Sequence, residues 1–436
     1  MSLEERDQVL PMSLLDLLSN SLILAQICPH LGTPTLLALA ATSKHFTSLM
    51  YGSPYSFRYL NLSALKHRLS PTNVAVQERW RQGYTGTYRT VDDYYSVALR
   101  WVFGSLKRRN VLADVTTLVL DGLSVPNALL SDILCDASFN VRMLSIRRCV
   151  NISDQGLRQV LKYIMRPSRP EGSPKLKGLY YFGYPDRISN GTAINHDRIT
   201  QATVMVGVTS SPGAQLGMQL HRRSLSEASN NCITKPNDED ETGIEIHRYD
   251  WYTTPGEIIS RQIDSEWVPI LQACSGVISF DAVLCRHNKE IYSRCNIATI
   301  DLGAQGCQIC HSSPEGPAFA GKSPIDQLPL LNPPPLHSSS VRAAQRPALG
   351  ESFTPPFFAR CRDCLESRWC EGCNVWWCED CYSVSKAQTQ NIGKGEGKAD
   401  VEGNGNVNIK VHLGLCVQGC LMEEMYHGSG EGGMWG

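Results

Sequence analysis

The residues with the clearest chemistry are cysteines near the carboxyl end. The run CRDCLESRWCEGCNVWWCEDCY holds six of them as three Cys-x2-Cys pairs. Each pair turns two thiolates toward one point, and two pairs supply the four sulfurs of a structural zinc site, about 2.3 Å from the metal. Ten of the 17 cysteines fall into five close pairs, numbered here in chain order: Cys307/Cys310, Cys361/Cys364, Cys370/Cys373, Cys378/Cys381 and Cys416/Cys420. These ten are the candidate metal ligands, and zinc is the predicted metal.

A disulfide framework is the first alternative, and the amino terminus argues against it. MSLEERD is acidic, and the apolar stretch 14–28 contains Asp16, Ser19, Asn20 and Gln26, so we expect neither a secretion signal nor a membrane span. The expected location is the cytoplasm, the nucleus or both, where disulfides are rare. Iron–sulfur and redox uses of Cys-x2-Cys remain as further alternatives.

Only four residues separate the third pair from the fourth, too few to wrap both round one ion. This core resembles a ZZ-type cross-brace finger, in which alternate pairs share ions. The fourth pair is then expected to join an earlier pair, the first or the second, and the third pair to join the fifth. Ten thiolates exceed two four-sulfur sites by two, and His311 and His412 are spare candidates. We predict two structural zinc ions.

Composition excludes several functions. With 41 basic and 42 acidic residues the net charge is −1, so no global field attracts nucleic acid or an anionic membrane, and neither is expected as a partner. No GxSxG or HExxH motif is present, and GKGEGK at 393–398 lacks the glycine spacing and the Ser/Thr of a phosphate loop. We therefore expect a protein without catalytic activity.

The amino-terminal part is patterned as short helices. From Ser19 onward it resembles an F-box, although Ser19-Asn20 replaces the family's opening Leu-Pro. The resemblance implies that the helices dock a Skp-type adaptor. The residues that match the family's apolar positions are Ile23, Leu24, Ile27, Leu31, Leu36, Leu37 and Phe46. An ordinary amphipathic cap on the next domain is the alternative.

A strand motif, apolar-x-x-apolar-x-apolar, follows. Its best copies, beginning at Val115 and Val141, lie 26 residues apart, a leucine-rich-repeat period. The second copy continues through Cys149 into Asp154-x-Gly-Leu, similar to the cysteine-containing repeat subtype, where a small Cys fills a corner and Asp-x-Gly-Leu starts the return helix. Plain buried strands are the alternative for four weaker copies: Phe57/Leu60/Leu62, Leu176/Leu179/Tyr181, Val277/Phe280/Ala282 and Ile297/Ile300/Leu302.

The expected fold is α+β, with F-box-like helices, a degenerate leucine-rich-repeat solenoid and a cross-brace-like zinc module. Composition shifts and Pro-rich or Gly-rich stretches set the boundaries. The expected order is 10–55 F-box-like helices, 56–185 repeat region, 186–245 disordered insertion loop, 246–311 further repeat-like elements, 312–356 Pro-rich extended linker, 357–424 zinc module and 425–436 flexible tail. The insertion also holds a basophilic kinase motif at Ser224 and Ser226.

Taken together, this order of segments and the WCxGCNxWWCxxCY core resemble a group of F-box proteins from filamentous fungi. The resemblance implies a substrate-recognition adaptor of an SCF-type cullin ubiquitin ligase, with a protein client held by the repeats and the zinc module. Two alternatives remain: a zinc module that itself recruits a ubiquitin-conjugating enzyme, and a structural scaffold for protein interaction.

Overall fold

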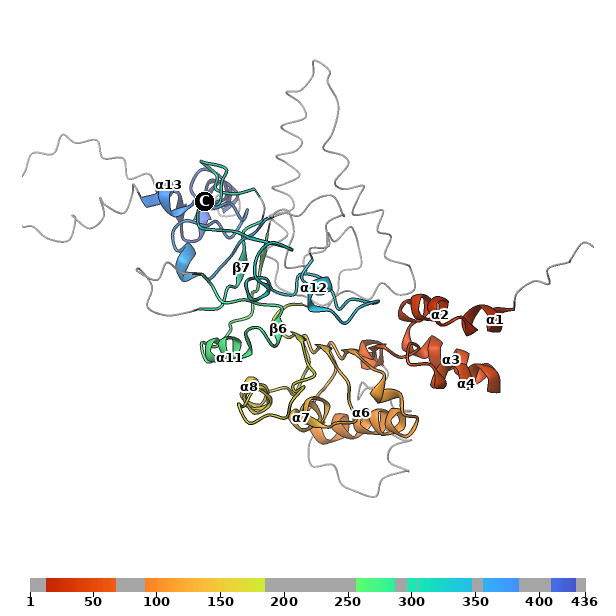
Figure 1. The fold of residues 1–436 in the computed structure, drawn as a ribbon. Coiled ribbons are helices and arrows are strands. Elements are labelled where there is room, and N and C mark those ends of the chain that lie inside the picture. The colour runs from red at the N-terminus through yellow and green to blue at the C-terminus, as the bar shows by residue number, and fades with distance from the viewer. Residues whose placement is uncertain are drawn as a thin grey trace, which may run out of the picture. The chain divides into compact units, whose positions relative to one another are not determined.

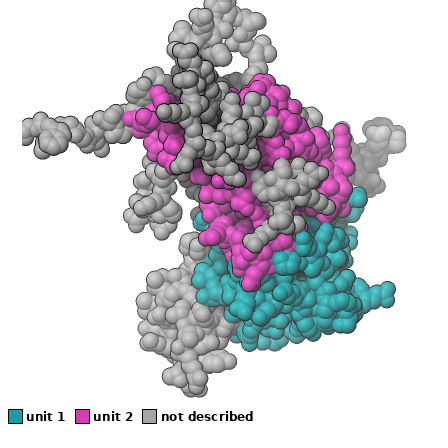
Figure 2. Space-filling model, turned by 90° about the vertical axis from the view of Figure 1, so that its left-hand side faces the viewer, with its two compact units in different colours: residues 1–188, 269–281, 332–345 teal, residues 189–268, 282–331, 346–436 magenta. Residues whose placement is uncertain are grey.

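The computed structural model describes residues 13–67, 91–184, 256–286, 296–303, 305–346, 356–383 and 409–428. The chain is a mixed α+β protein with two compact units, coloured separately in Figure 2. Unit 1 comprises residues 1–188, 269–281 and 332–345, and unit 2 comprises 189–268, 282–331 and 346–436. The predicted insertion loop 186–245, including Ser224 and Ser226, lies outside the described residues.

Unit 1 begins with four short helices, which we call the helical head: α1 (Leu14–Ser19), α2 (Ser21–Ile27), α3 (Thr33–Thr42) and α4 (Lys44–Gly52), with the 3-10 turn η1 (Cys28–His30) after α2. Side-chain caps explain where three of them start. Ser13 and Asp16 form a capping box on α1, and the Ser43 hydroxyl accepts the Phe46 N–H at the start of α4. The Asn20 carboxamide oxygen accepts the N–H groups of Leu22 and Ile23, so Ser19-Asn20 starts α2 with a polar cap.

A five-stranded parallel sheet forms the body of unit 1 (Figure 1). Each strand pairs with the next one along the sheet, and Leu60, Leu118, Leu144, Leu179 and Phe280 lie in register across it. These side chains are all buried, which makes the sheet a core element. The strands, in spatial order, are β1 (Tyr59–Asn61), β2 (Thr117–Val119), β3 (Met143–Ser145), β4 (Gly178–Tyr180) and β6 (Ser279–Phe280).

Helices connect these strands, as parallel pairing requires. In Figure 1, α6, α7 and α8 follow one side of the sheet. They span Val91–Arg108, Asn127–Cys135 and Asp154–Ile164, with the 3-10 turns η2 (Ser63–His67) after β1 and η3 (Val111–Ala113) after α6. The helix α11 (Trp267–Cys274) precedes β6.

Buried polar groups hold the strand ends together. The Asp121 carboxylate, after β2, accepts the Ser145 hydroxyl at 2.6 Å, the Arg147 backbone N–H at 2.8 Å and the Arg147 guanidinium at 2.8 Å. Arg147 in turn donates to the Tyr184 carbonyl at 2.8 Å. Each member satisfies a polar group that burial would otherwise penalise, so this network fixes the alignment of β2, β3 and β4.

Cys149, in the second strand motif, contacts the strand segment before it. The Cys149 thiol donates to the Leu120 carbonyl of the preceding strand segment, at 3.1 Å. Burial raises the pKa of this thiol, which keeps the donor protonated. Asp154 and Gly156 begin α8, with Ser153 as its cap.

Three of the four weaker strand motifs belong to the same parallel sheet, as β1, β4 and β6. The fourth prediction was wrong. Ile300 lies in β7 (Ile300–Asp301), the centre of a separate antiparallel sheet in unit 2, between β5 (Glu257–Ile258) and β10 (Ala359–Arg360). A two-residue buried strand has the same apolar pattern in either kind of sheet, so the motif alone does not separate them.

The rest of unit 2 consists of short elements around an aromatic core. Trp369, Trp376, Trp377 and Tyr382 are all buried and pack with Phe358, which stacks on Trp376 at a centroid distance of 4.6 Å. These four aromatic residues, which lie between and beside the cysteine pairs, are therefore core residues. The remaining elements of unit 2 are β8 (Ala318–Phe319) paired with β9 (Pro356–Phe357), β11 (Val411–His412) paired with β12 (Leu415–Cys416), η4 (Ile325–Gln327), η5 (Asp363–Leu365), α13 (Glu379–Ser383) and α15 (Cys420–Gly428).

The prediction that 312–356 is an extended linker was wrong for its described part. Residues 312–331 belong to unit 2 and 332–345 to unit 1, where α12 (Val341–Ala344) lies. Leu328, Leu330 and Leu331 are buried. Proline fixes φ and removes a donor, which suits irregular packed chain as well as a linker, and the leucines between the prolines supply the apolar surface. The residues of the predicted zinc module, 357–424, belong to unit 2, which also contains 256–268 and 282–331.

Candidate metal centres

The thiols gather into three groups, each with all its sulfurs within 4.8 Å of one another. Such groups could hold metal ions. We call them site A, formed by Cys307, Cys310, Cys378 and Cys381; site B, formed by Cys370, Cys373, Cys416 and Cys420; and site C, formed by Cys285, Cys361 and Cys364. All three lie in unit 2.

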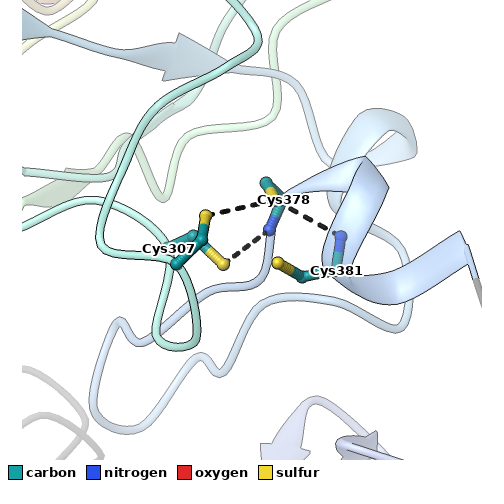
Figure 3. Close-up of side chains that lie close together, drawn as sticks. Cys307, Cys378 and Cys381 are labelled. Carbon is teal, nitrogen blue, oxygen red and sulfur yellow. Dashed lines mark hydrogen bonds between the residues drawn. The ribbon is translucent and has the colours of Figure 1, made fainter.

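Site A joins a tight turn to the start of α13. Gly306 has φ +73°, and a Cβ there would come within 2.9 Å of the His311 backbone, so the turn that presents Cys307 requires glycine. Cys378 directly precedes α13 and donates its N–H to the Cys307 sulfur at 3.2 Å. Figure 3 shows Cys307, Cys378 and Cys381 converging from the two segments.

Site B joins the third pair to the hairpin and helix near residue 420. Cys370 and Cys373 lie in a turn closed by the Cys370 N–H, which donates to the Val375 carbonyl at 2.8 Å. Cys416 ends β12, and its N–H donates to the Cys370 sulfur at 3.1 Å. Cys420 begins α15. The hairpin β11–β12 therefore positions one ligand and the following helix another.

The sulfur separations fit a shared ion. A tetrahedral ion with four sulfurs at about 2.3 Å sets neighbouring sulfurs about 3.8 Å apart. The Cys310–Cys378 sulfurs of site A are 3.7 Å apart, and the Cys373–Cys416 sulfurs of site B are 3.8 Å apart. A disulfide needs sulfurs about 2.05 Å apart, so the spacing fits metal ligands and does not fit a disulfide.

Local hydrogen bonds favour thiolates, the form that binds metal. The contact with the Ser312 hydroxyl, at 3.2 Å, lowers the pKa of Cys310 to about 6. In site B, hydrogen bonding from Cys373 and its neighbours holds the pKa of Cys370 below its ordinary value. Sites A and B thus each contain at least one thiol whose pKa is lowered.

The sequence left the partner of the fourth pair open, and the structure brings it to the first pair, Cys307/Cys310. The third pair meets the fifth, as expected, so sites A and B interleave along the chain. His311 and His412 belong to none of the groups found among the described residues. The second pair, Cys361/Cys364, meets Cys285 instead of joining either four-thiol group.

Cys285 was missed because it stands singly in the sequence. The sequence did carry one indication of a further ligand. The ten paired cysteines exceed the eight ligands of two four-sulfur sites, and the remaining pair would need a partner to bind a metal. Cys285 and Cys295 are the single cysteines nearest upstream of the five pairs, and Cys295 lies outside the described residues. Counting ligands against ions would have directed attention to this region.

The seven predicted docking residues of the helical head divide by burial. Leu24 and Leu36 are 1% and 0% exposed, so they form the core of the head and are unavailable to a partner. The other five are partly exposed: Ile23, Ile27, Leu31, Leu37 and Phe46. Leu22, beside them on α2, is 76% exposed and was not predicted.

Comparisons of the chain with protein-family models, curated proteins and solved structures give no match. Among the described residues, no helix has the length and apolar character needed to cross a membrane.

Proposed function

We propose that the chain is the substrate-recognition adaptor of an SCF-type ubiquitin ligase, without catalytic activity of its own. The helical head docks a Skp-type adaptor that connects to the cullin, and the parallel sheet with the zinc module holds a protein client. The observation that carries this proposal is the apolar surface of the head, which the sequence places where an F-box contacts its adaptor.

That surface is Leu22 with Ile23, Ile27 and Leu31. Leu22 is among the most exposed large apolar side chains of the described residues. Ile23 and Ile27 on α2, and Leu31 directly after η1, are partly exposed. Exposed apolar side chains gathered in one short segment are a candidate docking surface. The capped helices give it a fixed shape, which favours a specific partner over nonspecific contact.

The sheet supports the second half of the proposal. Its strands carry one repeated motif and follow one another in the sheet in chain order, an arrangement typical of repeat domains that bind proteins. The Cys149 contact with Leu120 links consecutive units of this arrangement. In repeat domains, each repeat buries its apolar face against the next repeat.

We also propose that sites A and B each hold a structural zinc ion. Four thiolates complete a closed tetrahedral shell, which leaves no position for a reacting water. Folding energy for the small elements around them then comes from the metal, on the order of 10 kcal/mol per ion. The aromatic core of unit 2 is small, which is the setting in which such ions are needed.

The test is co-purification of the full chain with a Skp-type adaptor. We expect a stable complex with the unmodified chain and its loss in the variant Leu22→Asp/Ile23→Asp, because a carboxylate would have to be desolvated at the contact. Val150→Asp, at a 59% exposed site outside the head, is the matched control and should bind normally. Absence of any complex with the unmodified chain rejects adaptor docking.

One observation favours a second candidate function. The interleaving of the ligand pairs of sites A and B is the cross-brace also used by modules that recruit ubiquitin-conjugating enzymes. If this module is the active element, the chain supports ubiquitin transfer from such an enzyme in the absence of cullin. The adaptor proposal predicts transfer only when the Skp-type adaptor and cullin are added.

A further inference from the structure

Site C is a third thiol group, which has no role if only sites A and B hold zinc ions. Cys285, Cys361 and Cys364 are 6%, 4% and 5% exposed, whereas sites A and B each include one exposed cysteine. The sulfurs of Cys285 and Cys364 are 3.5 Å apart, close to the spacing in the two four-thiol groups. Thiols at this spacing repeat the geometry already assigned to metal ligands.

The hydrogen bonding of site C also matches the other two. The Cys361 N–H donates to the Cys285 sulfur at 3.2 Å, so the backbone of one segment contacts the sulfur of another. Cys378 does the same to Cys307 in site A, and Cys416 to Cys370 in site B, at 3.2 and 3.1 Å. Backbone N–H groups that point at sulfur stabilise the thiolate form. All three groups therefore share one construction.

Two other uses of these thiols fit less well. A disulfide needs sulfurs about 2.05 Å apart and joins thiols two by two, whereas three thiols converge here. A core role is shown by Cys274, which is fully buried and belongs to none of the groups among the described residues. Filling a core does not require three sulfurs to meet at one point.

We infer that site C binds a third ion, a thiophilic divalent metal such as zinc, with the thiolates of Cys285, Cys361 and Cys364 as three of its ligands. Cys285 belongs to a short ladder in which its N–H donates to the Asn296 carbonyl at 2.7 Å and the Ala298 N–H donates to the Val283 carbonyl at 2.9 Å.

The ion would fasten this ladder to the turn after β10. Cys361 follows that strand directly, and Cys364 lies in η5. Site C thus takes up the cysteine pair that remains when the two cross-braced sites are complete. The inference goes beyond the adaptor proposal and does not depend on docking by the helical head.

The decisive experiment counts zinc in the full chain by native mass spectrometry and elemental analysis. We expect three ions per chain in the unmodified protein, two in Cys285→Ser, and three in the control Cys274→Ser, which removes an equally buried thiol outside the groups. Two ions in the unmodified chain, or the same count in Cys285→Ser as in the unmodified chain, would overturn the inference.

A second measurement uses only the unmodified chain, in case the Ser variant fails to fold. Iodoacetamide labelling is followed peptide by peptide while a chelator removes zinc stepwise. We expect labelling of Cys285, Cys361 and Cys364 to rise together with the loss of one zinc equivalent. A disulfide between Cys285 and Cys364 in a non-reduced peptide map contradicts the inference. A count of two with sites A and B occupied leaves the proposed function intact, whereas loss of adaptor binding leaves site C intact.

Discussion

Glu315 lies at the centre of a buried ion network, and its removal is the sharpest test of how unit 2 is built. Its carboxylate accepts two hydrogen bonds from Arg368, at 2.6 and 3.0 Å, and one from Arg360 at 3.3 Å. Both arginine side chains are 4% exposed and Glu315 is 11% exposed. It also accepts the Glu379 N–H at 3.0 Å, which joins it to the start of α13 beside site A.

The change Glu315→Gln keeps the volume and removes the charge. Arg360 then loses its ion pair with Glu315, and Arg368 keeps only the longer pair with Glu379, at 3.7 Å. Breaking a buried pair in this way costs about 3–5 kcal/mol. The lower end applies here, about 3 kcal/mol, because Arg368 keeps the carbonyls of Cys364 and Trp377 and Arg360 keeps that of Ala359.

The assay is urea unfolding at pH 7 and fixed zinc concentration, followed by tryptophan fluorescence. Burial alone would raise the pKa of Glu315, but the hydrogen bonds and charges of the two arginines hold it below its usual value. The contribution of the carboxylate is therefore complete above the unfolded pKa near 4.5 and is lost as pH falls through the folded pKa. At pH 7 the whole effect is present.

Glu366→Gln, at an exposed position of the segment that carries Arg360 and Arg368, is the control and should change the free energy of unfolding by less than about 0.5 kcal/mol. A loss below about 1 kcal/mol for Glu315→Gln refutes the reasoning. That outcome would mean that the arginines are solvated and that residue 315 belongs to an extended linker after all.

Three further predictions follow from single contacts. Gly156→Ala should destabilise the chain by about 1–3 kcal/mol in urea unfolding, because its Cβ would lie 2.4 Å from the Asn127 side-chain amide nitrogen. Gly104→Ala, in α6, should stabilise the chain by about 0.5–1 kcal/mol, because its Cβ would meet only the Arg108 side chain, at 4.0 Å. Burial and the neighbouring His30, whose ring nitrogen is 2.9 Å from that of His337, lower the pKa of His337. Its NMR titration midpoint should therefore lie below 6.5 and should rise in His30→Gln. The stability that neutral His337 contributes is present above pH 6.5 and is lost as pH falls through the lowered pKa. Chelation of zinc should abolish amide-exchange protection in α13 and β11–β12 while β2 and β3 stay protected; equal loss in both sets contradicts metal-dependent folding of unit 2 alone.

The cysteine spacing predicted much of the candidate site. Four residues between Cys373 and Cys378 forced the two pairs apart, and that steric argument gives the interleaving seen in sites A and B. The choice between the first and the second pair for site A could not be made from sequence. That choice depends on how residues 312–356 are folded. Their proline content indicated a linker, but the leucines between the prolines are buried.

The strand motif predicted the strands β1, β2, β3, β4 and β6 of the parallel sheet, but it did not distinguish them from β7 of the antiparallel sheet. In the parallel sheet the central apolar residue of each motif lies in register with that of the neighbouring strand, as Leu118 does with Leu144. At Ile300 the same pattern occurs in an antiparallel strand. The pattern indicates only that a strand is buried on both faces, and this is true of buried strands in either kind of sheet. In the helical head, the stripe residues Leu24 and Leu36 face inward because the most apolar positions of a small bundle make its core.

The proposed metal ions would account for how so small an aromatic core can hold unit 2 together. Each group joins segments far apart in sequence: residues near 307 with those near 380, residues near 371 with those near 418, and residue 285 with 361–364. Closing such long loops is entropically costly for a chain with short strands and few helical turns, and apolar burial around Trp376 alone is limited. Metal binding would shift the equilibrium toward the folded chain, because an ion binds the assembled thiols and not the open chain. Its binding free energy is much larger than the entropic cost of closing the loops. The Glu315 network lies within the loop closed by site A, so its buried charges become tolerable only when that loop is closed. Stability of the ion network and occupancy of site A should therefore be coupled, and Glu315→Gln should weaken zinc retention at site A more than at site B.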